Sequence, residues 1–199
     1  VIPTAIHIAA AQAVQDELVP ALAMLGDAMQ RKADDFWPII KTGRTHLQDA
    51  TPIRLGQEFL GYVGQAERSI ERAQQALDEL SEVALGGTAV GTGVGTHQQF
   101  APKVIEKLSQ LIGVKLRETT NHFQAQSTLD NIVAASGAMN AIAVSLMKIA
   151  NDLRWLGSGP RGGIGEIDLP EVQPGSSIMP GKVNPVIPES VCQVAAQVM

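Results

Sequence analysis

Residues 55–85 of the chain read LGQEFLGYVGQAERSIERAQQALDELSEVAL. Apolar side chains recur in this stretch every three or four residues, at Phe59, Val63, Ala66, Ile70, Ala73, Leu77 and Leu80. This spacing follows the turn of an α-helix, so the pattern predicts one long helix with an apolar stripe. Thr51-Pro52 ahead of it is typical of an N-cap followed by a first-turn proline, and Gly86-Gly87 predicts an end near Leu85.

Further helices are predicted on both sides of this stretch. They are expected over residues 3–36 with a kink at Pro20, from Phe100 to Ile112 with Gly113 as the stop, from Gln126 to Leu156, and from Val186 onward. Strand signals are nearly absent, and only 4% of the residues are aromatic. Residues 157–185 read as one irregular segment. We therefore expect an all-α fold, a bundle of long helices in one domain over residues 1–199.

The expected helix from Gln126 to Leu156 carries small residues on several of its faces, namely Ala134, Ala135, Gly137, Ala138, Ala141, Ala143 and Ala150. Small side chains allow other helices to approach closely on more than one side. The pattern favours burial in an oligomer, and a tightly packed monomeric bundle is the alternative.

Composition excludes several classes of protein. The chain has 199 residues, 45% of them hydrophobic, and a net charge of −5, which argues against a nucleic-acid binder. Cys192 is the single cysteine, so an intrachain disulfide is impossible. The apolar run from Ala141 to Met147 is far shorter than the roughly 20 residues of a membrane helix. We expect a soluble, cytoplasmic protein.

Residues 175–185, GSSIMPGKVNP, hold two glycines and two prolines, which predict a loop. Two hydroxyls, an ammonium and an amide lie on it, and these are the donors that an anionic substrate needs. A phosphate-binding P-loop is excluded because Gly175 and Gly181 are one residue too far apart and Val183 stands where a hydroxyl is required. An anion-binding catalytic loop and a plain solvated turn both remain possible.

A second polar segment lies at residues 43–52, GRTHLQDATP. One interpretation is a solvated capping loop in front of the next helix. The other is a proton-transfer site at His46, since an imidazole titrates near neutral pH and hydroxyl and amide groups surround it in sequence.

Two other chemistries are not supported by the motifs. The glycines of residues 91–96, GTGVGT, lack the spacing and the preceding strand of a dinucleotide-binding fingerprint. His7, His97 and His122 show no metal-ligand spacing, and the chain has neither an HExxH nor a CxxC motif. We expect no metal site.

Taken together, these segments resemble the fumarase/aspartase superfamily. Residues 175–185 look like its signature loop, and residues 43–52, 55–59, 86–93 and 146–152 are similar to class II fumarases. The resemblance covers essentially the whole chain. It implies a lyase of the tricarboxylic acid cycle that adds water to fumarate reversibly to give (S)-malate, without a metal or an organic cofactor.

The resemblance also implies a role for several residues. Ser176 would remove the proton from C3 of malate, and the dianionic aci-carboxylate that forms would be stabilised by the loop. The substrate carboxylates would be held by Thr45, Ser177, Lys182, Val183 and Asn184. His46 would handle the proton on the hydroxyl side through a bound water, and Glu189 would pair with His46.

Within this superfamily the resemblance further implies a homotetramer whose active sites combine loops from three subunits. The chain would be the central domain, with the N-terminal and C-terminal domains of the full-length enzyme absent. We therefore expect little or no activity from these 199 residues alone.

Two other functions remain open. Aspartate ammonia-lyase shares the scaffold and the loop, and residues 186–189, VIPE, lean slightly toward it. Residues 119–126, TTNHFQAQ, look more like fumarases and favour the hydratase. The third possibility is a non-catalytic helical assembly core, although every matched site residue is present.

Overall fold

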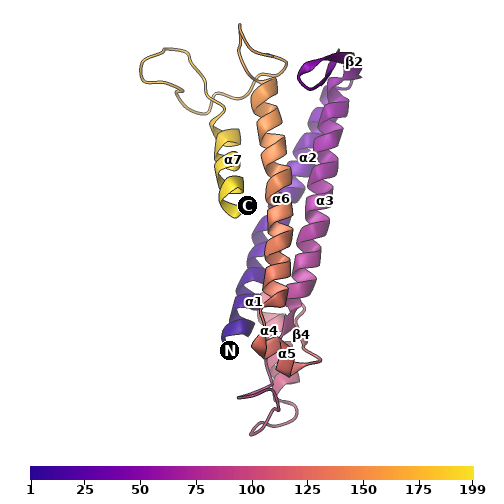
Figure 1. Ribbon diagram of the computed structural model, residues 1–199, viewed down its shortest axis with the longest axis vertical. Coiled ribbons are helices and arrows are strands. Elements are labelled where there is room, and N and C mark those ends of the chain that lie inside the picture. Colours follow the sequence, from indigo (N-terminus) through magenta and orange to yellow (C-terminus); the bar gives the residue numbers. More distant parts are fainter. The chain divides into compact units, whose positions relative to one another are not determined.

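The computed structural model describes residues 1–199, which form two compact units, residues 1–138 and 139–199 (Figure 1). Each unit is described by itself. The prediction of an all-α fold built on long helices is confirmed. The helices are α1 (Ile2–Ala13), α2 (Val19–Asp35), α3 (Leu55–Ser81), α4 (Phe100–Ile112), α5 (His122–Ser127), α6 (Asp130–Leu156) and α7 (Val186–Val198).

In the first unit, α2 and α3 pack along each other, as Figure 1 shows. Small residues let them approach closely, because a Cβ built on Gly26 would lie 3.5 Å from the Cβ of Ala66. Phe36 packs edge-on against Phe59, with ring centroids 5.0 Å apart. The buried core of this unit includes Ala11, Leu22, Ala33, Phe59, Ala66, Ala73 and Leu80. Thus the predicted stripe on residues 55–85 is the face that α3 buries.

A π-helical segment, η1 (Val14–Leu18), lies just ahead of Pro20, where the sequence predicts a kink; the kink itself stays a prediction. The N–H of Val19 bonds to the carbonyl of Val14, five residues back. Proline has no N–H and its ring crowds the carbonyl four residues earlier, so the regular ladder cannot continue through Pro20. The wider turn ahead of Pro20 lets one nearly continuous rod run from α1 into α2.

The prediction that Thr51-Pro52 caps a helix is wrong. These residues lie in strand β2 (Gln48–Arg54), which pairs antiparallel with β1 (Ile40–Thr45), and Pro52 stands opposite Thr42. Proline is tolerated on an edge strand because its missing N–H is not needed there. Helix α3 begins later, with Arg54 as N-cap and its N–H bonded to Oε1 of Gln57 at 2.9 Å. The hairpin thus connects the end of α2 to the start of α3.

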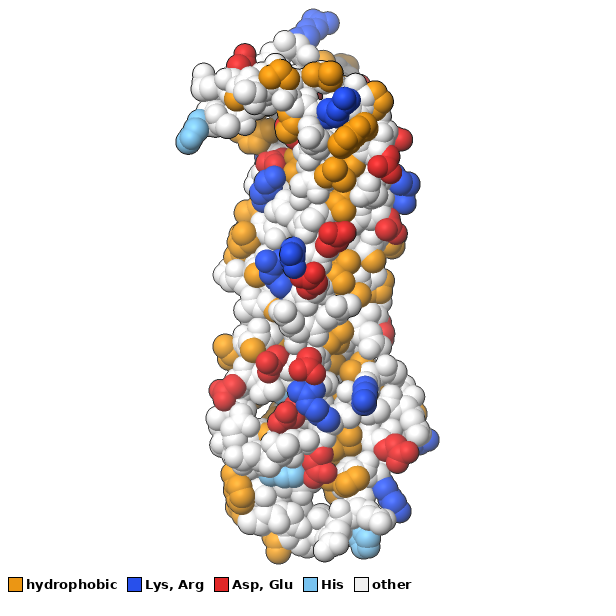
Figure 2. Space-filling model, turned by 90° about the vertical axis from the view of Figure 1, so that its right-hand side faces the viewer, with side chains coloured by type: hydrophobic (Ala, Val, Ile, Leu, Met, Phe, Trp, Pro, Cys, Tyr) orange, Lys and Arg blue, Asp and Glu red, His pale blue; other side chains and the backbone are white.

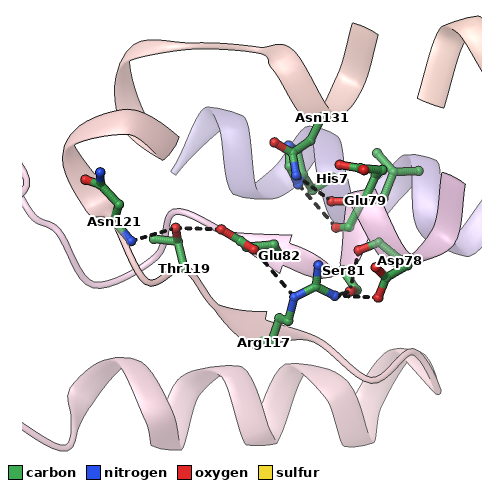
Figure 3. Close-up of polar contacts among 10 residues, drawn as sticks. His7, Asp78, Glu79, Ser81, Glu82, Arg117, Thr119, Asn121 and Asn131 are labelled. Atoms are coloured by element: carbon green, nitrogen blue, oxygen red, sulfur yellow. Dashed lines mark hydrogen bonds and ion pairs between the residues drawn. The ribbon is translucent and has the colours of Figure 1, made fainter. Parts of the chain in front are cut away.

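A polar cluster fixes the other end of α3 (Figure 3). Strand β3 (Glu82–Val83) pairs parallel with β4 (Arg117–Glu118). The Arg117 guanidinium contacts the Asp78 carboxylate at 2.8 Å and that of Glu82 at 3.5 Å, and the Thr119 hydroxyl donates to Glu82 at 2.7 Å. This network connects the end of α3 to the segment that leads into α5.

The glycine-rich loop that follows β3 connects it to helix α4. Gly91 N and Gly93 N both donate to the Gly87 carbonyl, at 2.9 and 3.0 Å. Gln126 donates to the Thr88 carbonyl at 2.8 Å, and a Cβ on Gly87 would lie 2.1 Å from Oε1 of Gln126. The Gln126 side chain therefore packs against Gly87, where a larger residue would clash. Within residues 119–126, this glutamine holds the glycine-rich loop in place.

Helix α4 ends as predicted, with Gly113 in the left-handed conformation at φ 72°. The predicted helix from Gln126 to Leu156 is divided in two. Asn121 caps the short helix α5 by accepting from the N–H groups of Phe123 and Gln124, and α6 then begins at Asp130. The carboxamide of Asn121 satisfies N–H groups that would otherwise have no partner, which is why a helix begins there.

In the second unit, the irregular segment over residues 157–185 and the helix from Val186 are confirmed. Helix α6 is the one helix long and apolar enough to cross a membrane by length and composition, and 22% of its most apolar window is buried. The core helix of a soluble protein meets the same criterion. The short apolar run seen in the sequence understated this helix because alanines extend its apolar surface.

Charged side chains of both signs are interspersed on the face drawn in Figure 2, with hydrophobic side chains between them. This face presents no extended basic field of the kind that binds nucleic acid. The mixed charge agrees with the net charge of −5.

Candidate active site

The loop over residues 175–185 is closed on itself by three hydrogen bonds. Gly175 N donates to the Lys182 carbonyl at 3.0 Å, Lys182 N donates to the Met179 carbonyl at 3.3 Å, and Asn184 Nδ2 donates to the Gly175 carbonyl at 2.8 Å. Gly175 is required at this closure because a Cβ there would lie 2.4 Å from the Lys182 carbonyl oxygen. The loop is therefore a defined turn and not an extended linker.

Ser176 is the best-positioned hydroxyl of the loop. Its Oγ accepts hydrogen bonds from the backbone N–H groups of Ile178 and Met179, both at 3.2 Å. Donors aimed at an oxygen stabilise its anionic form and so favour loss of its proton. The arrangement supplies two of the donors that a serine alkoxide needs.

Part of the loop lines a hollow of about 440 Å³. Ser176, Lys182 and Val183 line it, and its volume is in the range of about 300–1,000 Å³ that small-molecule sites occupy. The Lys182 side chain is exposed and pairs with no carboxylate. Ser177 is also exposed. The lining of the hollow thus combines the ammonium of Lys182 and the carboxylate of Glu171 with the polarised hydroxyl of Ser176.

Asn184 and Glu189 sit where the loop meets α7. The amide nitrogen of Asn184 holds the loop closed, so its carbonyl oxygen is the atom left for other partners. Glu189 lies in the first turn of α7, half-buried, with its N–H bonded to the Pro185 carbonyl at 3.0 Å. A carboxylate near a helix N-terminus interacts favourably with the helix dipole.

In the first unit, His46 and Leu47 form the two-residue turn between β1 and β2, with Thr45 paired to Gln48. Both turn residues have positive φ, 54° and 61°, as a type I′ turn requires. Neither is glycine, so the turn stores backbone strain of about 1–3 kcal/mol per residue. The imidazole and the Thr45 hydroxyl project from an exposed tip.

An ion pair at the base of this hairpin was not predicted from the sequence. Lys41 Nζ lies 2.9 and 2.8 Å from the two carboxylate oxygens of Glu58, and the Lys41 side chain is only 8% exposed. The one signal for it was an acidic residue in the first turn of the helix that follows the segment.

The eight predicted site residues fall into two groups. Ser176, Ser177, Lys182, Val183, Asn184 and Glu189 belong to the second unit, within or next to one loop. Thr45 and His46 belong to the first unit. The predicted pairing of His46 with Glu189 stays a prediction.

No group of three or more His, Cys, Asp or Glu side chains is arranged to hold a metal ion. Cys192 is half-buried, with its sulfur 3.6 Å from Oδ1 of Asn151. The candidate site of the second unit therefore consists of the polar groups of the loop over residues 175–185.

Comparison with known proteins gives consistent matches. A class II fumarate hydratase of Mycobacterium tuberculosis (strain CDC 1551 / Oshkosh) is 56% identical over 198 residues, covering 99% of this chain and 42% of that protein. The mitochondrial fumarate hydratase of Danio rerio is 56% identical over 197 residues, covering 99% and 39%. The chain thus spans about two-fifths of the length of these relatives.

A solved structure agrees with them. The crystal structure of recombinant class II fumarase from Schistosoma mansoni matches with a TM-score of 0.94 and 36% identity, over 99% of this chain and 44% of that chain. The model of the family described as "Lyase" matches residues 1–199. Because that match covers every residue of the chain, the chain belongs to this lyase family.

Proposed function

We propose that this chain is the central part of a class II fumarate hydratase, a hydro-lyase that interconverts fumarate and (S)-malate. The observation that carries the proposal is the pair of N–H groups aimed at Ser176 Oγ, beside the ammonium of Lys182. The relatives named fumarate hydratase, at 56% identity, support the same substrate class.

Removal of the C3 proton of malate needs a base and a site for the resulting charge. In our proposal Ser176, as its alkoxide, takes this proton, and the electron pair moves into the adjacent carboxylate to give an aci-carboxylate dianion. A serine hydroxyl is a weak base, and the N–H groups of Ile178 and Met179 stabilise its ionised form. The preorganised donors then act without reorganisation in the transition state.

The dianion gains more from a cation than the ground state does, because one more negative charge is present. We assign this role to Lys182 together with the Asn184 carboxamide and the backbone of Val183. Ser177 and Thr45 would hold the substrate carboxylates through their hydroxyls.

Loss of the C2 hydroxyl completes the elimination and needs a proton on the departing oxygen. We assign this proton to His46, acting through a bound water, with Glu189 orienting the imidazole. In the hydration direction, the same groups would activate the water that attacks fumarate.

The dicarboxylate substrate, the assembly and the cellular location belong to the proposal as well. The long apolar sequence of α6, with small residues on several of its faces, supports a homotetramer in which copies of this helix pack together and active sites are shared between subunits. The domains flanking residues 1–199 in relatives would complete the enzyme. We propose a cytoplasmic enzyme, although one relative is named as mitochondrial.

The test compares two adjacent hydroxyls in a protein carrying this chain at the full length of its relatives. Fumarate formation from (S)-malate is followed by ultraviolet absorbance. Ser176→Ala is expected to lower kcat by about 10²–10⁴-fold, because general-base catalysis contributes that much. Ser177→Ala, which keeps the base, is expected to raise KM more than it lowers kcat. Near-parental turnover by Ser176→Ala would refute the role given to the loop.

A further inference from the structure

We infer that Lys41 and Glu58 form a positioning pair that sets the direction of the β1–β2 hairpin and thereby places His46. The inference rests on the proposed function, in which His46 handles the proton on the hydroxyl side. Neither residue reaches the turn itself, so the pair would act through His46 and not on substrate.

The pair differs from the other lysine and arginine ion pairs of the first unit by its burial. The side chains of Lys41 and Glu58 are 8% and 24% exposed, whereas those of Lys32 and Asp35 are 54% and 61% exposed. An exposed pair contributes about 0–1 kcal/mol and holds nothing firmly in place. A buried pair is held to one geometry because separating its charges leaves each one uncompensated.

The position of the pair in the hairpin explains what it controls. Lys41 stands opposite Ile53 near the open end of the ladder, and Glu58 lies in the first turn of α3. From Thr45 to Ala50 every residue is exposed, so packing against the rest of the unit does not hold the tip. The direction of the tip is therefore determined at the base of the hairpin, where the ion pair joins β1 to α3.

The hairpin acts as a lever. Five residues separate Lys41 from His46, a length of about 16 Å at roughly 3.3 Å per residue. A tilt of about 4° at the base then moves the imidazole by about 1 Å, and a 1 Å misplacement costs about a hundredfold in rate. We expect loss of the Lys41–Glu58 contact to permit such a tilt.

The experiment measures kcat for fumarate formation from (S)-malate in the full-length protein. Lys41→Met and Glu58→Gln are each expected to lower kcat by about 10- to 100-fold. Lys32→Met, which removes an exposed ion pair on the same unit, is the matched control and is expected to stay within about twofold. Glu58→Gln keeps the shape of the side chain and removes its charge and one of its two acceptor oxygens, so it carries the test if Lys41→Met fails to fold.

The second readout combines Lys41→Met with His46→Gln. If the pair acts through His46, Lys41→Met lowers kcat by less than about twofold in the His46→Gln background. An equal loss in both backgrounds would indicate a general structural role and overturn the inference. Unchanged kcat in Lys41→Met and Glu58→Gln, alongside a large loss in His46→Gln, would overturn the inference and leave the proposed function intact. Unchanged kcat in His46→Gln would instead overturn the role proposed for His46.

Discussion

The hairpin of β1 and β2 holds Thr45 and His46 with a ladder of paired residues, from Ile40 opposite Arg54 to Thr45 opposite Gln48, with one irregularity between Thr42 and Arg44. The loop over residues 175–185 holds Ser176 and Lys182 with a few hydrogen bonds and no regular structure. The hairpin is stiff along its length and is directed from its base, whereas the loop is shaped by contacts beside the reactive hydroxyl. We therefore expect substitutions at the base of the hairpin to affect His46 at its distant tip. Substitutions in the loop are expected to affect only the neighbouring Ser176 and Lys182.

The largest effect is expected for Asn184→Ala, which should lower turnover strongly while leaving the stability of the fold nearly unchanged. This change removes the hydrogen bond from Nδ2 to the Gly175 carbonyl, the one side-chain bond among the three that close the loop. We expect turnover of malate to fall by about a hundredfold, since the base and the cation lose their fixed positions. The urea midpoint of unfolding should be nearly unchanged, because an irregular loop contributes little to the packed core.

Asp168→Ala is the control for this prediction, because Asp168 is exposed in the same irregular segment and lies outside the hollow. Its turnover should match the parent. A large drop in the urea midpoint of Asn184→Ala would show that the loop is part of the cooperative core and would remove the contrast with the hairpin.

A smaller effect, now on stability, is expected for Gly43→Ala in the hairpin. A Cβ at this position would lie 2.6 Å from the Thr51 carbonyl oxygen, at the irregularity between Thr42 and Arg44. We expect a loss of about 1–2 kcal/mol in the free energy of unfolding, measured in urea. Gly64→Ala in α3 is the control, since nothing lies within 4 Å of its added Cβ, and helix propensity favours alanine. Equal stability of Gly43→Ala and Gly64→Ala would contradict the picture of a tightly registered hairpin.

The helices were predictable from the sequence because a helix with one buried face carries apolar residues at every third or fourth position. The stripe from Phe59 to Leu80 and the stop at Gly113 are both readable within a few turns of the chain, and both are confirmed. A disturbance of the helix near Pro20 was readable for the same reason, since the missing N–H acts on the nearest turn, but its π-helical form was not.

The hairpin was missed because nothing in residues 40–54 alternates between apolar and polar. Most of its side chains face solvent, so pairing between strands and not burial defines it. The proline at position 52 suggested a helix start, yet it lies on an edge strand.

In the candidate site, the identities of the polar residues were readable but their partners were not. The loop residues from Ser176 to Asn184 are neighbours in sequence, and the structure adds that Asn184 closes the loop while two N–H groups face Ser176. The Lys41–Glu58 pair joins a strand to a helix, and no spacing rule in the sequence connects those two positions.

The most direct test of the account compares (S)-malate with L-aspartate as the source of fumarate, using the full-length protein. Both substrates are supplied at saturating concentration, and the rise in fumarate absorbance is recorded. The account predicts rapid fumarate formation from malate and at least about a hundredfold slower formation from aspartate, because an amine would replace the hydroxyl for which His46 and its water are placed. Faster formation from aspartate than from malate would contradict the account and identify an ammonia-lyase on the same scaffold.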